Sequence, residues 1–178
     1  FERMVDLICI HDMPVASLTY YLHSFLSEAI SEAGFRVAIS GSGADELFTG
    51  YYDHYAFWLA EMSTQPSFPS LVADWRASYG AYVQNPLLQD PLVFNKRPGE
   101  RGHIYLNAKL FQQWLTEPFI EPFTEVPYVD NPLRNRMLNE LFRETVPVIL
   151  HEDDRNSMRY SVENRSPYLD RRLAEFMF

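Results

Sequence analysis

The sequence predicts an α/β fold in which a parallel sheet carries flanking helices and a mainly helical second half follows. Two apolar runs rich in β-forming residues, at 4–10 and 35–40, enclose a segment whose apolar residues recur at helical spacing. A strand, a helix and a strand in this order are typical of a βαβ unit, whose two strands run parallel. Of the 178 residues, 47% are hydrophobic, which is enough for one core.

The first strand is expected at 4–10 ("MVDLICI") and the helix after it at 18–33. Asp12 suits the N-cap of this helix, Pro14 its first turn and Gly34 its C-cap. The run "FRVAIS" then gives the second strand. Parallel strands end at the same edge of a sheet, where open α/β sheets bind their ligands. We therefore expect one crevice to be lined by His11, Asp12 and the loop Gly41–Asp45.

The rest of the chain is less regular. Short helices are expected at 71–83 and 107–115, within a part rich in proline and aromatic residues, and a firmer helix at 132–147 that Pro147 limits. The segment "SVENRSPYLD" has no period and is expected to be a loop, with a helix starting near Asp170. We expect a single partial domain over 1–178, which consists of a βαβ part (1–62), an irregular part (63–132) and a helical part (133–178).

Composition and charge exclude several classes of function. The formal net charge is −9, so nucleic acid, which binds basic surfaces, is not expected as a partner. Cys9 is the only cysteine, which excludes a disulfide framework and a thiolate zinc site and favours a cytoplasmic setting. No apolar stretch reaches the roughly 20 residues of a membrane-spanning helix, so no membrane partner is expected.

The stretch "FRVAISGSGADELFTGYY" (35–52) is the first candidate site. It lacks the lysine of a phosphate-binding P-loop, and Glu46 replaces the third glycine of the dinucleotide fingerprint. A strand that opens through Gly41 and Gly43 into a helix can still bind an anion with its backbone amides. Asp45 and Glu46 suit a phosphate only if a cation such as Mg²⁺ lies between. The alternative is that both carboxylates merely stabilise the start of a helix.

The stretch "HEDDRNSMRYSVENRSPYLDRR" (151–172) is the second candidate site. Its arginines can bind a carboxylate or phosphate, and a buried Glu163 can act as a base toward an incoming amine. The alternative is a solvated helix face with ion pairs between residues four apart.

Both stretches resemble segments of glutamine-hydrolysing asparagine synthetases. "VAISGSGADELFTGYY" resembles their S-G-[ED]-G-x-D-E-[LV]-F-x-G-Y segment, and "DDRNSMRYSVENRSPYLD" resembles their D-R-x-S-M…S-x-E-x-R-x-P-[FY]-L-D segment, in the same order. The resemblance implies part of the C-terminal synthetase domain, an ATP-pyrophosphatase of the adenine nucleotide alpha hydrolase-like type, here incomplete. In that family ATP adenylates an acceptor carboxylate, and ammonia displaces AMP to leave an amide.

The resemblance also implies roles for single residues, with ATP and Mg²⁺ as cofactors and a small carboxylate as acceptor. Asp45 would bind Mg²⁺. The nucleotide and pyrophosphate side would consist of Ser40, Gly41, Ser42, Gly43, Asp45 and Glu46. The acceptor side, which carries catalysis, would consist of Arg155, Glu163 and Arg165.

The chain departs from the family pattern in several places. Ser42 stands where the family often has a carboxylate, and Thr49 where it usually has a second glycine. The S-G-G-x-D-S loop, a later lysine-bearing segment and the glutaminase that supplies ammonia are missing, so we expect this segment alone to be inactive. Two alternatives stay open: the same chemistry on a sugar acid or a lactam-forming substrate, or a non-catalytic nucleotide-binding or assembly module. An unpaired sheet edge would also allow a homodimer.

Overall fold

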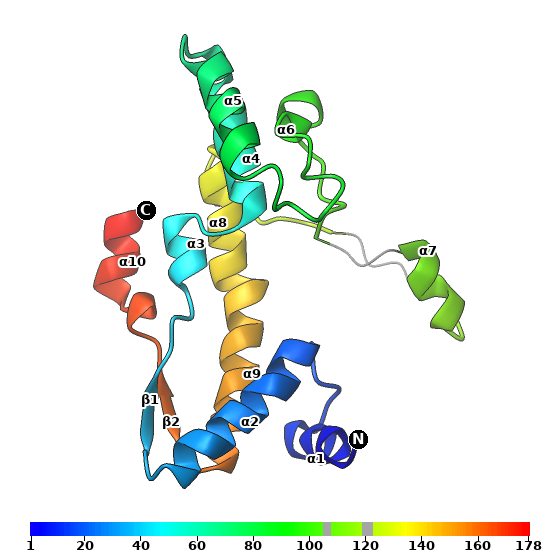
Figure 1. Cartoon of the computed structure of the whole chain (residues 1–178), viewed down its shortest axis with the longest axis vertical. Helices are drawn as coiled ribbons and strands as arrows, with labels where there is room; N and C mark the ends of the chain where they lie inside the picture. The colour runs from blue at the N-terminus through cyan, green and yellow to red at the C-terminus, as the bar shows by residue number, and fades with distance from the viewer. Residues whose placement is uncertain (105–107, 119–122) are drawn as a thin grey trace. The chain divides into compact units, whose positions relative to one another are not determined.

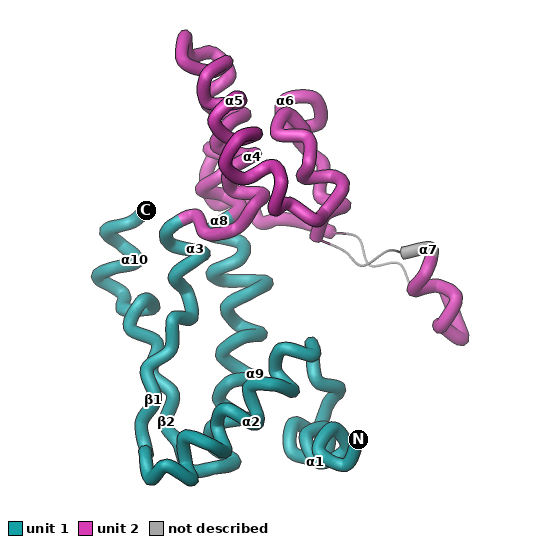
Figure 2. The backbone as a smooth tube through the Cα atoms, in the orientation of Figure 1, with its two compact units in different colours: residues 1–48, 137–178 teal, residues 49–136 magenta. Residues whose placement is uncertain are grey.

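The computed structural model describes residues 1–104, 108–118 and 123–178. Helices predominate in them, and two short strands form one parallel sheet (Figure 1). The prediction of a mixed α/β fold with a parallel sheet is confirmed in this general form. The chain divides into two compact units (Figure 2): unit 1 comprises residues 1–48 and 137–178, and unit 2 comprises residues 49–136. No helix in the described ranges has the length and apolar character needed to cross a bilayer.

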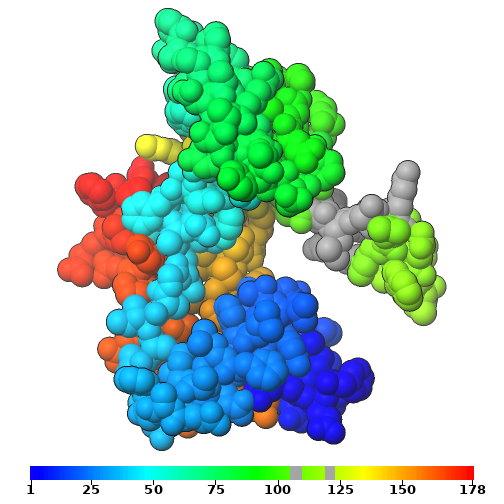
Figure 3. All heavy atoms as spheres, viewed as in Figure 1, coloured from blue at the N-terminus to red at the C-terminus, as the bar shows by residue number. Residues whose placement is uncertain are grey.

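Unit 1 contains the sheet and the helices that cover one of its faces. Its core is built on α9, which contacts both α1 and α2. The space-filling view shows α2 (blue) lying against α9 (orange) (Figure 3). The elements of unit 1 are α1 (Glu2–His11), α2 (Leu18–Glu32), β1 (Val37–Ile39), α3 (Ala44–Phe48), the end of α8 (Pro132–Phe142), α9 (Thr145–Arg159), β2 (Glu163–Arg165), the 3₁₀ helix η3 (Pro167–Leu169) and α10 (Arg171–Met177).

The predicted strand at 4–10 is wrong, because these residues belong to helix α1. Leu7 and His11, four residues apart, lie on one helical face and are both buried. The β-branched residues of this run favour a strand only weakly, and packing of α1 on α9 overrides that preference. The chain therefore has no βαβ unit at its start.

The boundaries of α2 differ in part from those predicted. Asp12 is the C-cap of α1, with φ 55°, rather than the N-cap of α2, and Ser17 takes the N-cap position. Pro14 lies before the helix. Ala33 rather than Gly34 is the C-cap, and Gly34 lies one position beyond it with φ 85°, a conformation that glycine adopts without strain.

The sheet joins two segments that lie far apart in the sequence. Strand β1 pairs in parallel with β2, and Ala38 lies opposite Asn164. The Ser40 amide donates to the Arg165 carbonyl (2.8 Å), and the Glu163 amide donates to the Arg36 carbonyl (2.9 Å). The prediction of a loop over 161–170 is therefore wrong for Glu163–Arg165, which form β2. Its three residues, Glu-Asn-Arg, show no apolar alternation, so only the partner strand reveals them as a strand.

The helices after residue 131 also need one correction. The predicted helix 132–147 is two helices, because α8 ends at Phe142 and Pro147 lies in the first turn of α9. Proline is tolerated there because the amides of the first turn donate no hydrogen bond within the helix, so the missing N–H of proline costs none. The predicted helix near Asp170 is confirmed as α10, whose N-cap Asp170 accepts a hydrogen bond from the Arg172 amide.

Unit 2 is helical and has its own core. The Phe57 and Phe94 rings stack with centroids 3.8 Å apart, and Val72 and Trp75 are buried. The helices predicted at 71–83 and 107–115 correspond to α5 and to α7 with η2, although residue 107 lies outside the described residues. The elements of unit 2 are α4 (Tyr52–Glu61), η1 (Met62–Thr64), α5 (Phe68–Ser78), α6 (Val93–Lys96), α7 (Ala108–Phe111), η2 (Gln112–Trp114) and the start of α8.

A buried ionic group lies in unit 2. Asp53 accepts a hydrogen bond from His103 Nε2 (3.1 Å), and Arg136 Nε lies 3.7 Å from the same carboxylate oxygen. Burial by itself would raise the pKa of Asp53, but the hydrogen bond from His103 and the charges of His54, His103 and Arg136 outweigh it and hold the pKa below its usual value. These contacts explain how the Asp53 carboxylate can be buried in this unit and still carry its charge.

Candidate functional site

The candidate site lies where β1 and β2 end, in unit 1. Figure 1 shows the two strands side by side, with the chain continuing from β1 to α3 and from β2 to α10. Three hydroxyl groups meet there: Ser40 Oγ lies 3.1 Å from Ser42 Oγ and 3.0 Å from Ser166 Oγ. The parallel pairing therefore brings the first sequence stretch, which contains Ser40, against the second, which contains Ser166.

The loop between β1 and α3 has backbone amides that are unpaired among the described residues, of which that of Gly41 belongs to an exposed residue, that of Ser42 to a half-buried one and that of Gly43 to a buried one. The Ala44 amide donates to the Gly41 carbonyl (3.1 Å). The amides of Gly41, Ser42 and Gly43 donate to no group in the part of the chain that the structure describes. Successive free amides in a turn bind anionic oxygens, so this loop fits the phosphate groups that the sequence predicts here.

The two carboxylates at the start of α3 differ in accessibility. Asp45 is exposed, whereas Glu46 is only 1% exposed. Asp45 is therefore the carboxylate of this pair that is accessible to a metal ion beside a phosphate.

Gly43 is needed for the contact between the two stretches. Its φ is 90°, and a Cβ added to it would lie 2.9 Å from Cγ of Leu169 in η3. Gly43→Ala should therefore lower the free energy of unfolding by about 2–4 kcal/mol, from the left-handed backbone and the overpacking together. Chemical denaturation measures this loss.

Gly41→Ala is the matched control for this substitution. Gly41 has no atom within 4 Å of an added Cβ, so the change in stability should stay within about 0.5 kcal/mol. Equal stability losses in the two variants would contradict the packing of Gly43 on Leu169.

Two cavities adjoin the ends of the strands. One of about 290 Å³ is lined by Ser40, Gly41 and Asn164, together with apolar residues of α2 and polar residues of α9. The other, of about 360 Å³, is mainly polar and is lined by Leu150, His151, Asp154, Asn164 and Ser166. Such clefts with a few convergent polar groups are typical of small-molecule sites.

Helix α9 supplies polar residues to this region and is fixed by buried contacts. His23 Nδ1 lies 2.8 Å from Asp153 Oδ1, beside the first cavity. On another face of α9, Glu152 lies against His11, and Asn156 Nδ2 donates to the Tyr20 carbonyl (3.0 Å). The expectation that His11 faces the ligand crevice is wrong, because its side chain is fully buried between α1 and α9. Asp12, the other residue of that expectation, caps α1.

The predicted acceptor-side residues lie at the surface of unit 1. Glu163 and Arg165 are each 60% exposed and pair with each other (2.9 Å), which holds the pKa of Glu163 below its usual value. The expected burial of Glu163 is therefore not observed. Arg155 is exposed, and its Nη1 lies 3.5 Å from the Ile10 carbonyl. The catalytic roles of these three residues remain predictions.

Sequence reasoning missed the residues of the second stretch that face the cavities. Side chains alternate along a strand, so Asn164 lies on the opposite face from Glu163 and Arg165. Asn164 and Ser166 line the cavities, as do Asp153 and Asp154 of α9. Recognising "ENR" as a strand would have revealed this alternation.

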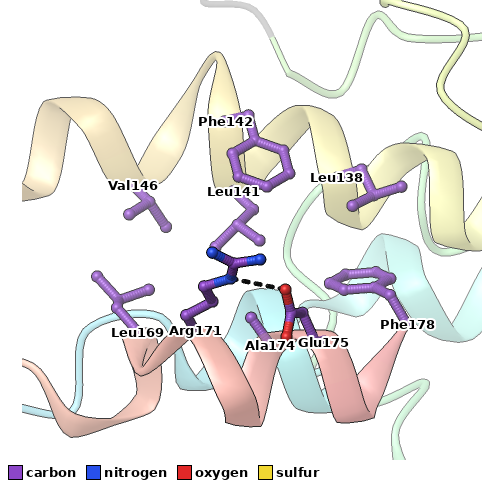
Figure 4. Close-up of a pocket in the computed structure, with 9 residues that line it drawn as sticks. All are labelled: Leu138, Leu141, Phe142, Val146, Leu169, Arg171, Ala174, Glu175 and Phe178. Atoms are coloured by element: carbon purple, nitrogen blue, oxygen red, sulfur yellow. Dashed lines mark hydrogen bonds and ion pairs between the residues drawn. The ribbon is translucent and has the colours of Figure 1, made fainter.

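A larger apolar pocket of about 540 Å³ lies elsewhere in unit 1, between α8, α9 and α10 (Figure 4). Leu141, Val146 and Phe178 are among its lining residues. Its two charged residues, Arg171 and Glu175, form an ion pair with each other (2.7 Å). Because it lacks the loop amides and hydroxyls found at the strand ends, it is not the candidate site.

One of three comparisons with known proteins gave a match. The family model for asparagine synthase matches residues 1–178, the whole of the chain. Searches of curated proteins and of solved structures gave no significant match. Synthetase domains of this family form amides at the expense of ATP. The chain belongs to the asparagine synthase family.

Proposed function

We propose that the chain is part of a synthetase domain that activates an acceptor carboxylate with ATP and joins it to ammonia released from glutamine. The parallel pairing of β1 with β2 carries this proposal, because it joins the loop at Gly41 to the segment at Ser166. Within the family, these two stretches correspond to the nucleotide side and the acceptor side. The fold proposed for the complete domain is of the adenine nucleotide alpha hydrolase type.

The residues of the loop fit ATP and Mg²⁺ as partners. The free amides of Gly41, Ser42 and Gly43 would bind phosphate oxygens, and the exposed carboxylate of Asp45 would bind Mg²⁺. ATP supplies the activation of the acceptor carboxylate, with pyrophosphate as the leaving group. The protein's own contribution is to hold the phosphates and stabilise the charge that develops on them.

Other parts of the proposal concern the setting of this domain. Ammonia would come from a glutaminase domain outside these residues, and the outer edges of the β1–β2 sheet would allow a homodimer. A cytoplasmic location is proposed because the chain, with Cys9 as its one cysteine, builds no disulfide.

The acceptor is proposed to differ from aspartate, on the basis of Ser42. A carboxylate at this position can interact with the ammonium group of aspartate or with the incoming nitrogen. Ser42 is neutral and shorter, and its hydroxyl already lies 3.1 Å from Ser40 Oγ. Loss of a charge from a closed site changes its electrostatics by several kcal/mol, more than a hydrogen bond restores. A larger acceptor, or one without an ammonium group, is therefore favoured.

Pyrophosphate release by the full-length protein tests both the reaction and the acceptor. With ammonia supplied directly and Mg²⁺ and ATP present, aspartate should give a lower kcat/KM than uronic acids such as glucuronate and galacturonate. Ser42→Glu should raise kcat/KM for aspartate relative to the parental protein, because it adds the carboxylate that an ammonium group needs.

Two results would count against these proposals in different ways. If aspartate gives the highest kcat/KM of the panel, the shifted acceptor is wrong and asparagine synthesis is the better account. If no carboxylate of the panel causes release of pyrophosphate, the proposal of a ligase activity is wrong.

A further inference from the structure

The side-chain amide of Asn164 is a polar group at the candidate site without a hydrogen-bond partner among the residues that the structure describes. It is half-buried, and the residue opposite it in β1 is Ala38, which has no polar side-chain atom. Its neighbours Glu163 and Arg165 lie on the other face of β2 and pair with each other. Of the three residues of β2, only Asn164 faces the interior of unit 1.

Asn164 is also the residue that lines both cavities at the strand ends. The cavity of about 290 Å³ has apolar walls from Leu26 and Ile30, which suit the flat base of a nucleotide. The cavity of about 360 Å³ is lined by Asp154 and Ser166, which suit a small polar molecule. Asn164 therefore lies where a nucleotide and a polar acceptor would be closest.

An asparagine amide has two N–H donors and a carbonyl acceptor, and it carries no charge. A half-buried amide that lines a polar cavity has a ready partner in an oxygen of a bound molecule. The wall of this cavity already contains a carboxylate, Asp154, which can only accept hydrogen bonds when it is charged. Asn164 adds two N–H donors to the same wall, and an acceptor rich in hydroxyl and carboxylate oxygens needs such donors.

We propose that Asn164 is a specificity-determining residue that donates hydrogen bonds to an oxygen of the acceptor, in the cavity beside Asp154 and Ser166. This inference rests on the proposed function and extends it to a residue outside the motif positions. The family's second segment, S-x-E-x-R-x-P, leaves the position of Asn164 open, so its identity can follow the acceptor.

The test uses Asn164→Ala and Asn164→Asp in the full-length protein. The reaction contains ammonia, Mg²⁺ and ATP, with the uronic acid or aspartate that the parental protein uses best. Asn164→Ala should raise KM for the acceptor about tenfold, the effect of losing hydrogen bonds to a polar or charged group. KM for ATP should stay within about twofold. Asn164→Asp replaces the donors by a second negative charge near Asp154, so kcat/KM should fall further, by about 100-fold.

Asn95 supplies the matched control, because it is exposed in unit 2 and the same two substitutions can be made there. Asn95→Ala and Asn95→Asp should leave both KM values unchanged. Saturation-transfer NMR with the same acceptor gives a readout independent of turnover, and its signal should weaken in the Asn164 variants alone.

Several results would overturn the inference. An unchanged acceptor KM in Asn164→Ala would show that the amide does not contact the acceptor, and a rise confined to KM for ATP would assign it to the nucleotide. A higher kcat/KM in Asn164→Asp would mean that the acceptor presents a cation there. If the parental protein releases no pyrophosphate with any acceptor of the panel, the proposed function fails and this inference fails with it.

Discussion

Glu152→Ala should lower the free energy of unfolding by about 2–4 kcal/mol, because it leaves a buried amide without its acceptor and opens a cavity in the core of unit 1. The side chains of His11 and Glu152 are 0% and 1% exposed, and His11 Nδ1 lies 3.1 Å from Glu152 Oε2. Glu152 Oε1 also accepts a hydrogen bond from the Ala16 amide (3.2 Å). The substitution would leave the Ala16 amide without its acceptor and open a cavity beside His11, whose Nε2 still lies 3.3 Å from Asn156 Oδ1.

Denaturant titration of the variants measures the effect. Glu152→Gln keeps the shape of the side chain and its acceptor oxygen, so its loss should be smaller, about 1–3 kcal/mol. Glu175→Gln is the control, because this exposed residue of α10 pairs only with Arg171 at the surface, and such pairs contribute about 0.3–0.5 kcal/mol. A stability loss for Glu152→Ala no larger than that of Glu175→Gln would contradict the role given to this contact.

The predictions were best for helices and strands whose own residues carry a clear pattern of apolar spacing or capping. The helix α2 has apolar residues at helical spacing and a glycine after it, and β1 is an apolar run that ends at a glycine-rich loop. The helix α10 begins at a side-chain cap that can be recognised from Asp170 alone. These signals are local, so they do not depend on what the segment packs against.

The predictions failed where a distant partner decides the structure. The run at 4–10 has the composition of a strand, but α9 offers it a helical packing surface and a buried partner for His11. The segment Glu163–Arg165 has the composition of a loop, but β1 makes it a strand. For the same reason the motif residues Glu163 and Arg165 were recognised, whereas Asn164, which faces the cavities, was not.

Asp45→Asn should reduce kcat for pyrophosphate release by the full-length protein by two to three orders of magnitude, or about 3 kcal/mol or more of transition-state stabilisation. The reason is that Asp45 is the exposed carboxylate next to the free amides of the loop, so it would hold the Mg²⁺ that stabilises the charge developing on pyrophosphate. Asparagine keeps the size of the side chain but lacks the charge that holds the metal. Far-UV circular dichroism should be unchanged.

The alternative role of Asp45, stabilising the start of α3 through the helix dipole, predicts a different outcome. Loss of that interaction costs about 0.3–1 kcal/mol of stability and leaves the chemistry intact. Asp74→Asn is the control for the substitution itself, because Asp74 is exposed on α5 in unit 2. If Asp45→Asn releases pyrophosphate at the rate of the parental protein and of Asp74→Asn, Asp45 acts on its helix and not on Mg²⁺. If kcat falls only in Asp45→Asn while its unfolding midpoint stays within a few degrees of the parental value, the helix role alone is too small to account for the loss, and the metal role stands.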